Sequence, residues 1–200
     1  QPAEKYATIG LNYLSAGTGV LVMNIGTAAD SQNIVIPAYN EEGKKVVGIM
    51  GGAFENFSGK SIFIPGTVDT INADAFTGCS AEVIFESDSL IKQLNDRAFR
   101  GYAGERVVLP DGLEKIGQVN GAGFANCGKL TVWIPDSVTF IAPACFKNNT
   151  GYVIVQYEGT QAQYDALSKD NIYDGLDWNN YQNPPSFNVP RPEIKTPMPS

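Results

Sequence analysis

Few residues of this chain have the chemistry that catalysis or metal binding requires. Histidine is absent from the 200 residues, which removes Ser-His-Asp and Cys-His catalysis and the commonest metal ligand. Cys79, Cys127 and Cys145 are an odd and small number for a disulfide scaffold, and they form no C-x-x-C pair. We therefore expect them to be small buried apolar residues, and we expect neither a metal nor a cofactor.

One acidic cluster keeps an enzymatic alternative open. Glu82, Glu86 and Asp88 lie close together in the sequence, as a carboxylate pair for glycoside hydrolysis requires. Ordinary exposed charges at the end of a strand explain them more simply. A second acidic stretch, at 170–178, has an aspartate before a glycine as in a calcium loop, but Ile172 and Tyr181 stand where oxygen ligands are required. We interpret this stretch as a solvated turn.

Charge and hydropathy exclude two classes of partner. The formal net charge is -7 and no cluster of Lys and Arg occurs, so a nucleic-acid partner is not expected. The longest strongly apolar stretch, "GVLVMNIG" at 19–26, is far shorter than the roughly 20 residues that span a bilayer. The composition instead predicts a chain that buries a core.

A long-period repeat organises the chain. Apolar triplets recur with the residue after them as "IVIP", "IFIP", "VIFE", "VVLP", "VWIP" and "VIVQ", beginning at 34, 62, 83, 107, 132 and 153. An aromatic landmark follows the same period at Phe54, Phe76, Phe99, Phe124 and Phe146. A third landmark is Ile49, Ile71, Leu94, Ile116 and Ile141. One strand per period of about 20 to 29 residues predicts a leucine-rich-repeat solenoid, because a single unit cannot bury its apolar face alone.

The predicted rung has a simple order. The triplet forms a strand of a parallel ladder, and the proline after it removes an N–H and turns the chain out of the strand. The Ile and Phe landmarks point into the coil. The short segments that end in Ala-Phe, such as "ADAF" and "NDRAF", have the Asn or Asp of a helix start and are expected to be single helical turns.

The recurring pattern I-P-x-x-V-x-x-I-x-x-x-A-F-x-x-C resembles the BspA-type leucine-rich repeats of surface proteins in anaerobic bacteria and some protists. One copy matches at Pro65, Val68, Ile71, Ala75, Phe76, Gly78 and Cys79, and another at Pro135, Val138, Ile141 and Phe146. The resemblance covers residues 33–156, with Glu86 and Gln156 in place of the proline. It implies a solenoid of about six rungs in a secreted or surface-tethered bacterial protein.

The ends of the chain differ from the repeats, as a solenoid requires. Residues 1–32 predict an N-terminal β-hairpin cap over the first rung. Residues 157–182 predict a C-terminal cap with a short helix that begins after Thr160, closed by Tyr157, Tyr164, Tyr173, Trp178 and Tyr181. Residues 183–200 are rich in proline and are expected to be a tail or a linker.

A candidate binding face follows from the alternation of side chains along a strand. If the outer residues of each triplet point inward, the middle ones project from the concave sheet face. They are Val35, Phe63, Ile84, Val108, Trp133 and Ile154. Ser61, Glu82, Arg106 and Thr131 flank them. An exposed apolar strip with a polar rim is typical of binding sites, although apolar residues also stabilise a sheet surface through cross-strand contacts.

The sequence therefore predicts a non-enzymatic binding or adhesion module, outside the cell or on its surface. Its expected partner is a protein or a glycan, with host extracellular matrix as one source. A structural spacer or assembly module of a larger surface protein is the alternative. A carboxylate-based glycan-active enzyme is a third and less favoured one.

Overall fold

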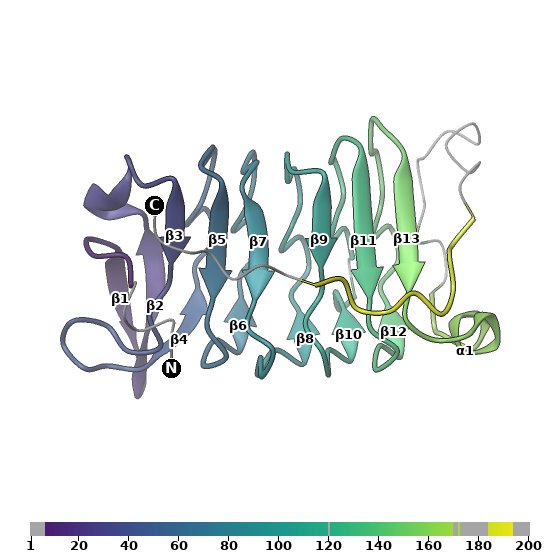
Figure 1. Ribbon diagram of the computed structural model, residues 1–200, viewed down its shortest axis with the longest axis horizontal. Helices are drawn as coiled ribbons and strands as arrows, with labels where there is room; N and C mark the ends of the chain where they lie inside the picture. The colour runs from purple at the N-terminus through teal and green to yellow at the C-terminus, as the bar shows by residue number, and fades with distance from the viewer. Residues whose placement is uncertain (1–6, 120, 170–171, 173–183, 194–200) are drawn as a thin grey trace.

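The apolar triplet of each repeat forms one strand of a long sheet. The computed structural model describes residues 7–119, 121–169, 172 and 184–193. Six parallel strands follow the order β13-β11-β9-β7-β5-β3, so successive repeats are neighbours in space (Figure 1). They are β3 (Asn33–Val35), β5 (Ser61–Ile64), β7 (Glu82–Phe85), β9 (Arg106–Val108), β11 (Leu130–Ile134) and β13 (Val153–Tyr157). The predicted mainly-β solenoid with a parallel strand ladder is confirmed.

Each of the first five rungs also carries a second strand, shorter than the first except in the first rung, that the sequence analysis did not predict. These strands are β4 (Val46–Ile49), β6 (Thr70–Ile71), β8 (Gln93–Leu94), β10 (Lys115–Ile116) and β12 (Phe140–Ile141). They contain the Ile and Leu landmarks, whose side chains are buried. Most are only two residues long, which is too short for an alternating pattern to reveal them.

The proline after the triplet starts a turn of the same form in several rungs. The N–H of Val68 donates to the carbonyl of Pro65 at 3.1 Å, and the N–H of Val138 donates to that of Pro135 at 3.2 Å. Proline suits this position because its ring fixes φ and its nitrogen needs no partner. The turn then directs the buried valine into the coil.

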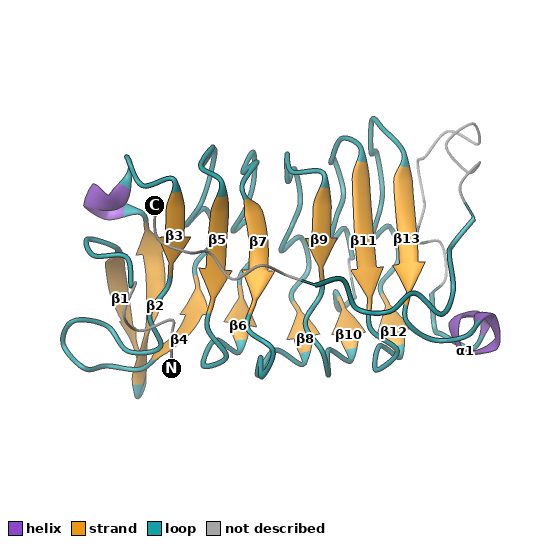
Figure 2. Ribbon diagram, in the orientation of Figure 1, coloured by secondary structure: helices purple, strands orange, loops and turns teal. Residues whose placement is uncertain are grey.

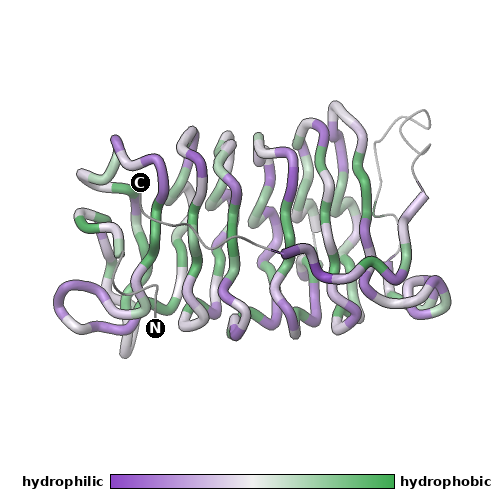
Figure 3. Tube along the Cα trace, in the orientation of Figure 1, coloured by the Kyte–Doolittle hydropathy of each residue, from purple (hydrophilic) through white to green (hydrophobic). Residues whose placement is uncertain are grey.

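A column of phenylalanines runs through the coil. Phe54, Phe76, Phe99, Phe124 and Phe146 are all buried. Adjacent rings are stacked, with centroids 5.7, 4.9, 5.1 and 5.8 Å apart along the column. Figure 3 shows the strands of the long sheet as largely hydrophobic and many of the loops between them as hydrophilic. The core is therefore a continuous ladder to which each rung contributes.

The Ala-Phe segments are tight turns and not the expected helical turns. The reason is a left-handed backbone on both sides of each phenylalanine. Two residues before it, φ is positive at Gly52, Asp74, Arg97, Ala122 and Ala144, and two residues after it at Asn56, Gly78, Gly101, Asn126 and Asn148. A left-handed residue interrupts a right-handed helix, and Gly and Asn adopt this conformation at the lowest cost.

Different structures close the two ends (Figure 2). At the N-terminal end, β1 (Asn12–Ala16) pairs antiparallel with β2 (Gly19–Asn24), and β2 continues into the sheet β1-β2-β4-β6. A 3-10 helix, η2 (Gly26–Ala28), follows them. At the C-terminal end, α1 (Gln161–Asp165) has Thr160 as its N-cap in a capping box with Gln163, which confirms the predicted helix start. Tyr173, Trp178 and Tyr181 lie outside the described residues.

The described helices are too short to cross a membrane. Neither α1 nor η2 approaches the length and apolar character of a spanning helix in the part of the chain that the structure describes.

Phe99 is the central ring of the column, so truncating it should be costly. We expect Phe99→Ala to lower the free energy of unfolding by about 3–5 kcal/mol, because it removes contacts with two stacked neighbours and leaves a cavity. Urea denaturation followed by circular dichroism measures this. Val119→Ala, at a side chain that is 80% exposed, is the control. A cost for Phe99→Ala no larger than that of the control would contradict the ladder as the main source of stability.

The left-handed alanines offer a stabilising change. Ala144 has φ of 57°, a conformation that is strained for a residue with a Cβ. We expect Ala144→Gly to stabilise the fold by about 0.5–1 kcal/mol, since the relief of strain exceeds the greater chain entropy of glycine. The matched change Ala162→Gly, at an exposed position in α1, should instead destabilise. Thermal unfolding of both variants measures the difference, and a lower melting temperature for Ala144→Gly would refute the argument.

Candidate functional site

The strand register brings the candidate binding residues into two rows on one face of the long sheet. Val35 pairs with Phe63 and Phe63 with Ile84, while Val108 pairs with Trp133. Residues two positions earlier share the same face, and there Ser61 pairs with Glu82 and Arg106 with Thr131. We call the first set the apolar row (Val35, Phe63, Ile84, Val108 and Trp133) and the second the polar row (Ser61, Glu82, Arg106 and Thr131).

The last rung has a different register from the one that the sequence suggested. Ile154 pairs with Thr131, and Gln156 pairs with Trp133. Placing Ile154 beside Trp133 was therefore wrong by two residues, and the apolar row ends in a glutamine. The error arose because "VIV" matches the triplet pattern better than "VQY" does, although the latter holds the aligned positions.

The expected exposure of the apolar row is also wrong. Phe63 is 4% exposed and Trp133 is 0% exposed, and the other members are buried as well. They are not part of the main core, since Val35, Phe63 and Ile84 form a separate buried cluster. The row is thus buried although it lies outside the main core, which an alternating pattern within the strands cannot reveal. Its role in ligand binding stays a prediction.

The polar row is more accessible. Glu82 is exposed, and Arg106 and Thr131 are half-buried. Ser61 is buried, and its hydroxyl donates to Oδ1 of Asn33 at 2.8 Å. An acid, a base and a hydroxyl group thus line the face beside the apolar row, where a ligand could reach them.

A distant segment of the chain lies on this face. Residues 184–193 run beside β13 and then across the C-terminal ends of β13 and β11 toward β9, in yellow in Figure 1. The N–H of Ser186 donates to the carbonyl of Val155 at 3.0 Å, and its carbonyl accepts from the N–H of Tyr157 at 2.8 Å. Farther along, the N–H of Val189 donates to the carbonyl of Tyr157 at 3.1 Å. The segment therefore first extends the sheet by one short parallel bridge.

Trp133 is the main side-chain contact of this segment. Its indole Nε1 donates to the carbonyl of Val189 at 3.0 Å. The guanidinium of Arg191 lies over the indole, 5.6 Å from its centroid, and forms an ion pair with Asp111. Trp133 thus binds an extended strand of polypeptide through a hydrogen bond and a cation–π contact.

Sequence analysis missed this contact because it treated residues 183–200 as a tail or linker. A signal was present in the alternation of the segment. Pro185, Phe187, Val189 and Arg191 are half-buried, whereas Ser186, Asn188 and Pro190 are exposed. This is the period of an extended strand with one face against a surface, but the many prolines concealed it.

Of the three carboxylates in the enzymatic alternative, Glu82 lies at the opposite end of β7 from the other two, whereas Glu86 and Asp88 both lie beside Gly66 of the preceding rung. Glu82 begins β7 and Glu86 follows its end. Glu86 Oε2 accepts from the N–H of Gly66 at 2.6 Å, and Glu158 Oε2 accepts in the same way from Asp136 at 3.1 Å. The register of β13 aligns Glu158 with Pro135, so the proline's position in the last rung belongs to Glu158 and the expected Gln156 was wrong by two residues. In both rungs the glutamate at that position caps the turn of the preceding rung. Within the described ranges no group of acidic or cysteine side chains could hold a metal ion, and the acidic stretch 170–178 lies outside those ranges except for Ile172.

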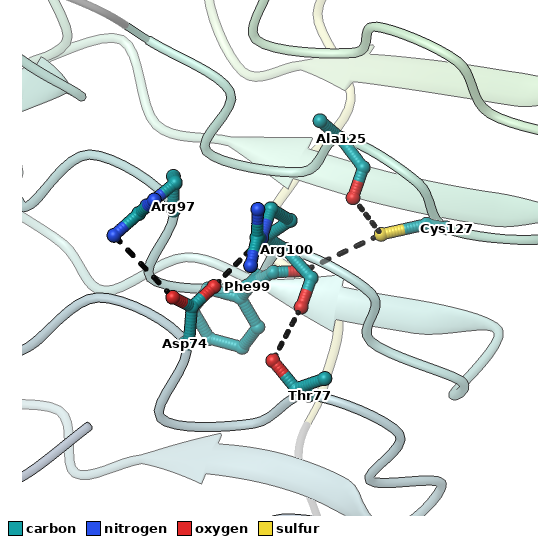
Figure 4. A network of polar contacts seen from close by, with 7 residues as sticks. All are labelled: Asp74, Thr77, Arg97, Phe99, Arg100, Ala125 and Cys127. Atoms are coloured by element: carbon teal, nitrogen blue, oxygen red, sulfur yellow. Dashed lines mark hydrogen bonds and ion pairs between the residues drawn. The ribbon is translucent and has the colours of Figure 1, made fainter. Parts of the chain in front are cut away.

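The cysteines are packing residues, as predicted. All three are free and buried. Burial raises the pKa of the Cys79 thiol to about 11, and those of Cys127 and Cys145 to about 12. Figure 4 shows Cys127, whose thiol donates to the carbonyl of Phe99 at 3.4 Å. A thiol that stays protonated and buried is a poor nucleophile.

The same close-up shows how polar groups join neighbouring turns. Asp74 forms ion pairs with Arg97, at 3.5 Å, and with Arg100, at 2.7 Å, from the next rung (Figure 4). The hydroxyl of Thr77 donates to the carbonyl of Arg100 at 3.0 Å. All three charged side chains are at least 28% exposed, and their contacts stay between rungs. We interpret the cluster as a link between turns.

Stacked rungs of this period, each with a parallel strand in one long sheet, define a leucine-rich-repeat protein. The family model of the BspA type leucine-rich repeat region matches residues 31–158 in six copies. The chain therefore belongs to this family, as the recurring I-P-x-x-V pattern predicted.

Solved structures share the fold at low sequence identity. A leucine-rich repeat protein of T. pallidum superposes with a TM-score of 0.56 at 21% identity, over 82% of this chain and 81% of that one. The pneumococcal vaccine antigen PcpA gives 0.56 at 20% identity, over 78% of this chain and 50% of that one. A leucine-rich cell surface protein of Faecalibacterium prausnitzii gives 0.49 at 21% identity, over 84% and 55%. This chain spans about half the length of the pneumococcal protein. No curated protein matches the sequence significantly.

The buried thiols predict both reactivity and pH dependence. In the folded protein they should not react with a thiol reagent at pH 8, whereas all three should react in denaturant. Their folded pKa values lie above the ordinary value of 9.0, so the stability they contribute is complete below about pH 9 and is lost as the pH rises toward 11 or 12. Urea unfolding at pH 8 and pH 10 measures this loss. Cys127→Ala should reduce it, and an unchanged pH dependence in that variant would contradict the assignment.

Proposed function

We propose that the protein is a non-enzymatic binding module, secreted or held at the bacterial surface, which uses the outward face of its six-stranded sheet to contact a protein ligand. The location rests on the family resemblance. The observation that carries the proposal is the contact between Trp133 and an extended segment of polypeptide.

The chemistry of the face favours a protein over a glycan. The groups used are those that a polypeptide offers: main-chain N–H and carbonyl groups along β13, a carbonyl for the indole of Trp133, and a guanidinium for Asp111. The side chains of the apolar row are buried and, apart from the indole N–H of Trp133, have no hydrogen-bonding group for a sugar hydroxyl. The exposed Glu82 and half-buried Arg106 add charges that select a partner more than they hold it.

A structural role is the second candidate, and one observation favours it. The apolar row is already buried, which is also what a row that only stabilises the chain or an assembly would show. In that case the solenoid is a spacer in a larger surface protein, and the face would capture no separate ligand.

The two candidates differ in what the polar row does. We would screen the protein against a panel of extracellular-matrix proteins and a glycan array, with the charge-reversed variant Glu82→Arg, Arg106→Glu in parallel. These side chains are accessible, so the variant should fold normally, whereas serine at Phe63 or Trp133 would open a buried cluster. We expect a protein of the panel to bind the wild type, and to bind the variant with at least tenfold lower affinity, because the reversed charges repel the partner that the original charges attract.

A matched control lies on another sheet. Glu114→Arg, Lys115→Glu reverses an adjacent pair of exposed charges at β10 and should leave binding unchanged. Equal loss in both variants, or a glycan hit alone, would overturn the proposed protein-binding face. If no protein or glycan of the screen binds, and the protein self-associates as its concentration rises, the structural role is the correct one.

A further inference from the structure

The segment 184–193 occupies the face that the proposed function requires. We propose that the part of the face between β9 and β13 is a site for an extended, proline-containing peptide with an arginine, and that residues 184–193 are its displaceable occupant within the chain. This inference rests on the proposed function, and it names the class of partner and the segment that regulates its access to the face.

The segment has the form of a bound peptide. Its half-buried and exposed side chains alternate, so that one edge lies on the sheet. Pro190 favours an extended conformation at Val189, whose carbonyl receives the indole N–H of Trp133. Pro190 and Pro192 have no N–H that needs a partner, so a chain of this composition can cross strand ends without losing hydrogen bonds.

The contacts of the segment are specific but few. None of residues 184–193 is fully buried, although Trp133 beneath them is 0% exposed. The ion pair of Arg191 with Asp111 is partly exposed, with 22% and 49% of the two side chains accessible. Phe187 lies against Tyr164, with ring centroids 5.7 Å apart. A segment that covers a buried aromatic residue while remaining accessible itself can be exchanged for another of the same chemistry.

The anchors define the chemistry of the partner. The indole N–H of Trp133 needs a main-chain carbonyl of the peptide as its acceptor. Two residues after that carbonyl, the peptide needs a cation that pairs with Asp111 and also lies flat on the indole. Arginine meets both conditions because its guanidinium is planar and always charged. An extended peptide with the order Val-Pro-Arg therefore fits the site, in the manner of proline-rich peptides on aromatic grooves.

The first experiment releases residues 184–193 from the face by changing the charge of Arg191. Arg191→Glu places a carboxylate beside Asp111 and should release the segment, whereas Arg191→Lys keeps the charge and serves as the matched control. Trp178→Phe in every protein leaves Trp133 as the single tryptophan, so quenching of its fluorescence by acrylamide reports whether the segment covers it. We expect a clear increase in quenching for Arg191→Glu and a smaller one for Arg191→Lys, which keeps the ion pair with Asp111 but not the planar group on the indole.

Binding from solution is measured with a fluorescent peptide that has the sequence of residues 184–193. We expect it to bind the Arg191→Glu protein at least about tenfold more tightly than the wild type, which corresponds to a segment that occupies about nine-tenths of wild-type molecules. The same peptide with alanine for arginine should bind more weakly. Asp111→Arg combined with Arg191→Glu restores an ion pair within the chain, so it should protect Trp133 again and exclude the peptide.

Two results would overturn the inference. If Trp133 remains equally shielded in the Arg191→Glu protein, the segment is a fixed part of the fold. If Trp133 becomes accessible but the peptide does not bind, the face has no peptide site of this chemistry. In either case, a protein hit that depends on Glu82 and Arg106 would leave the proposed function standing. Circular dichroism of each variant excludes loss of fold as the cause.

Discussion

Stacking between rungs is the constraint on which the rest of this structure depends. No rung can bury its apolar residues by itself, and adjacent phenylalanines of the column stack at 4.9 to 5.8 Å, so that the three inner rings each lie between two others. The parallel strands of the long sheet join all neighbouring rungs through hydrogen bonds, and the strands on the other side add links within two groups, β4-β6 and β8-β10-β12. The caps at both ends are therefore necessary, because an uncapped terminal rung would expose half of its contacts.

The turns between strands explain why certain residues that are not apolar recur in the repeat. Tight turns on both sides of each phenylalanine need a left-handed backbone, which accounts for Gly78, Gly101 and Asn126 in equivalent positions. Where the proline of the turn is missing, Glu86 and Glu158 instead accept a hydrogen bond from the neighbouring turn. Departures from the repeat are thus compensated locally, and the ladder continues without interruption.

A ladder of this kind leaves one problem on its outer surface. Its strands are rich in apolar residues on both faces, so the apolar row needs a cover that the rungs do not supply. Near β11, residues 184–193 provide that cover through Trp133 and Asp111. In the proposed function, a partner of this part of the face has to compete with the segment already present.

The sequence alone determined the repeat, its period, the parallel ladder, the burial of the phenylalanines and cysteines, and the N-cap at Thr160. These features follow from local patterns that recur or from the chemistry of single residues. Only the tertiary structure decided that Gln156 and not Ile154 aligns with Trp133, that Phe63 is buried, and that residues 184–193 cover Trp133. Register depends on the pairing of whole strands, and the cover is a contact between residues 56 positions apart, Trp133 and Val189. No periodic pattern encodes such a contact, because it depends on the face that the completed ladder presents.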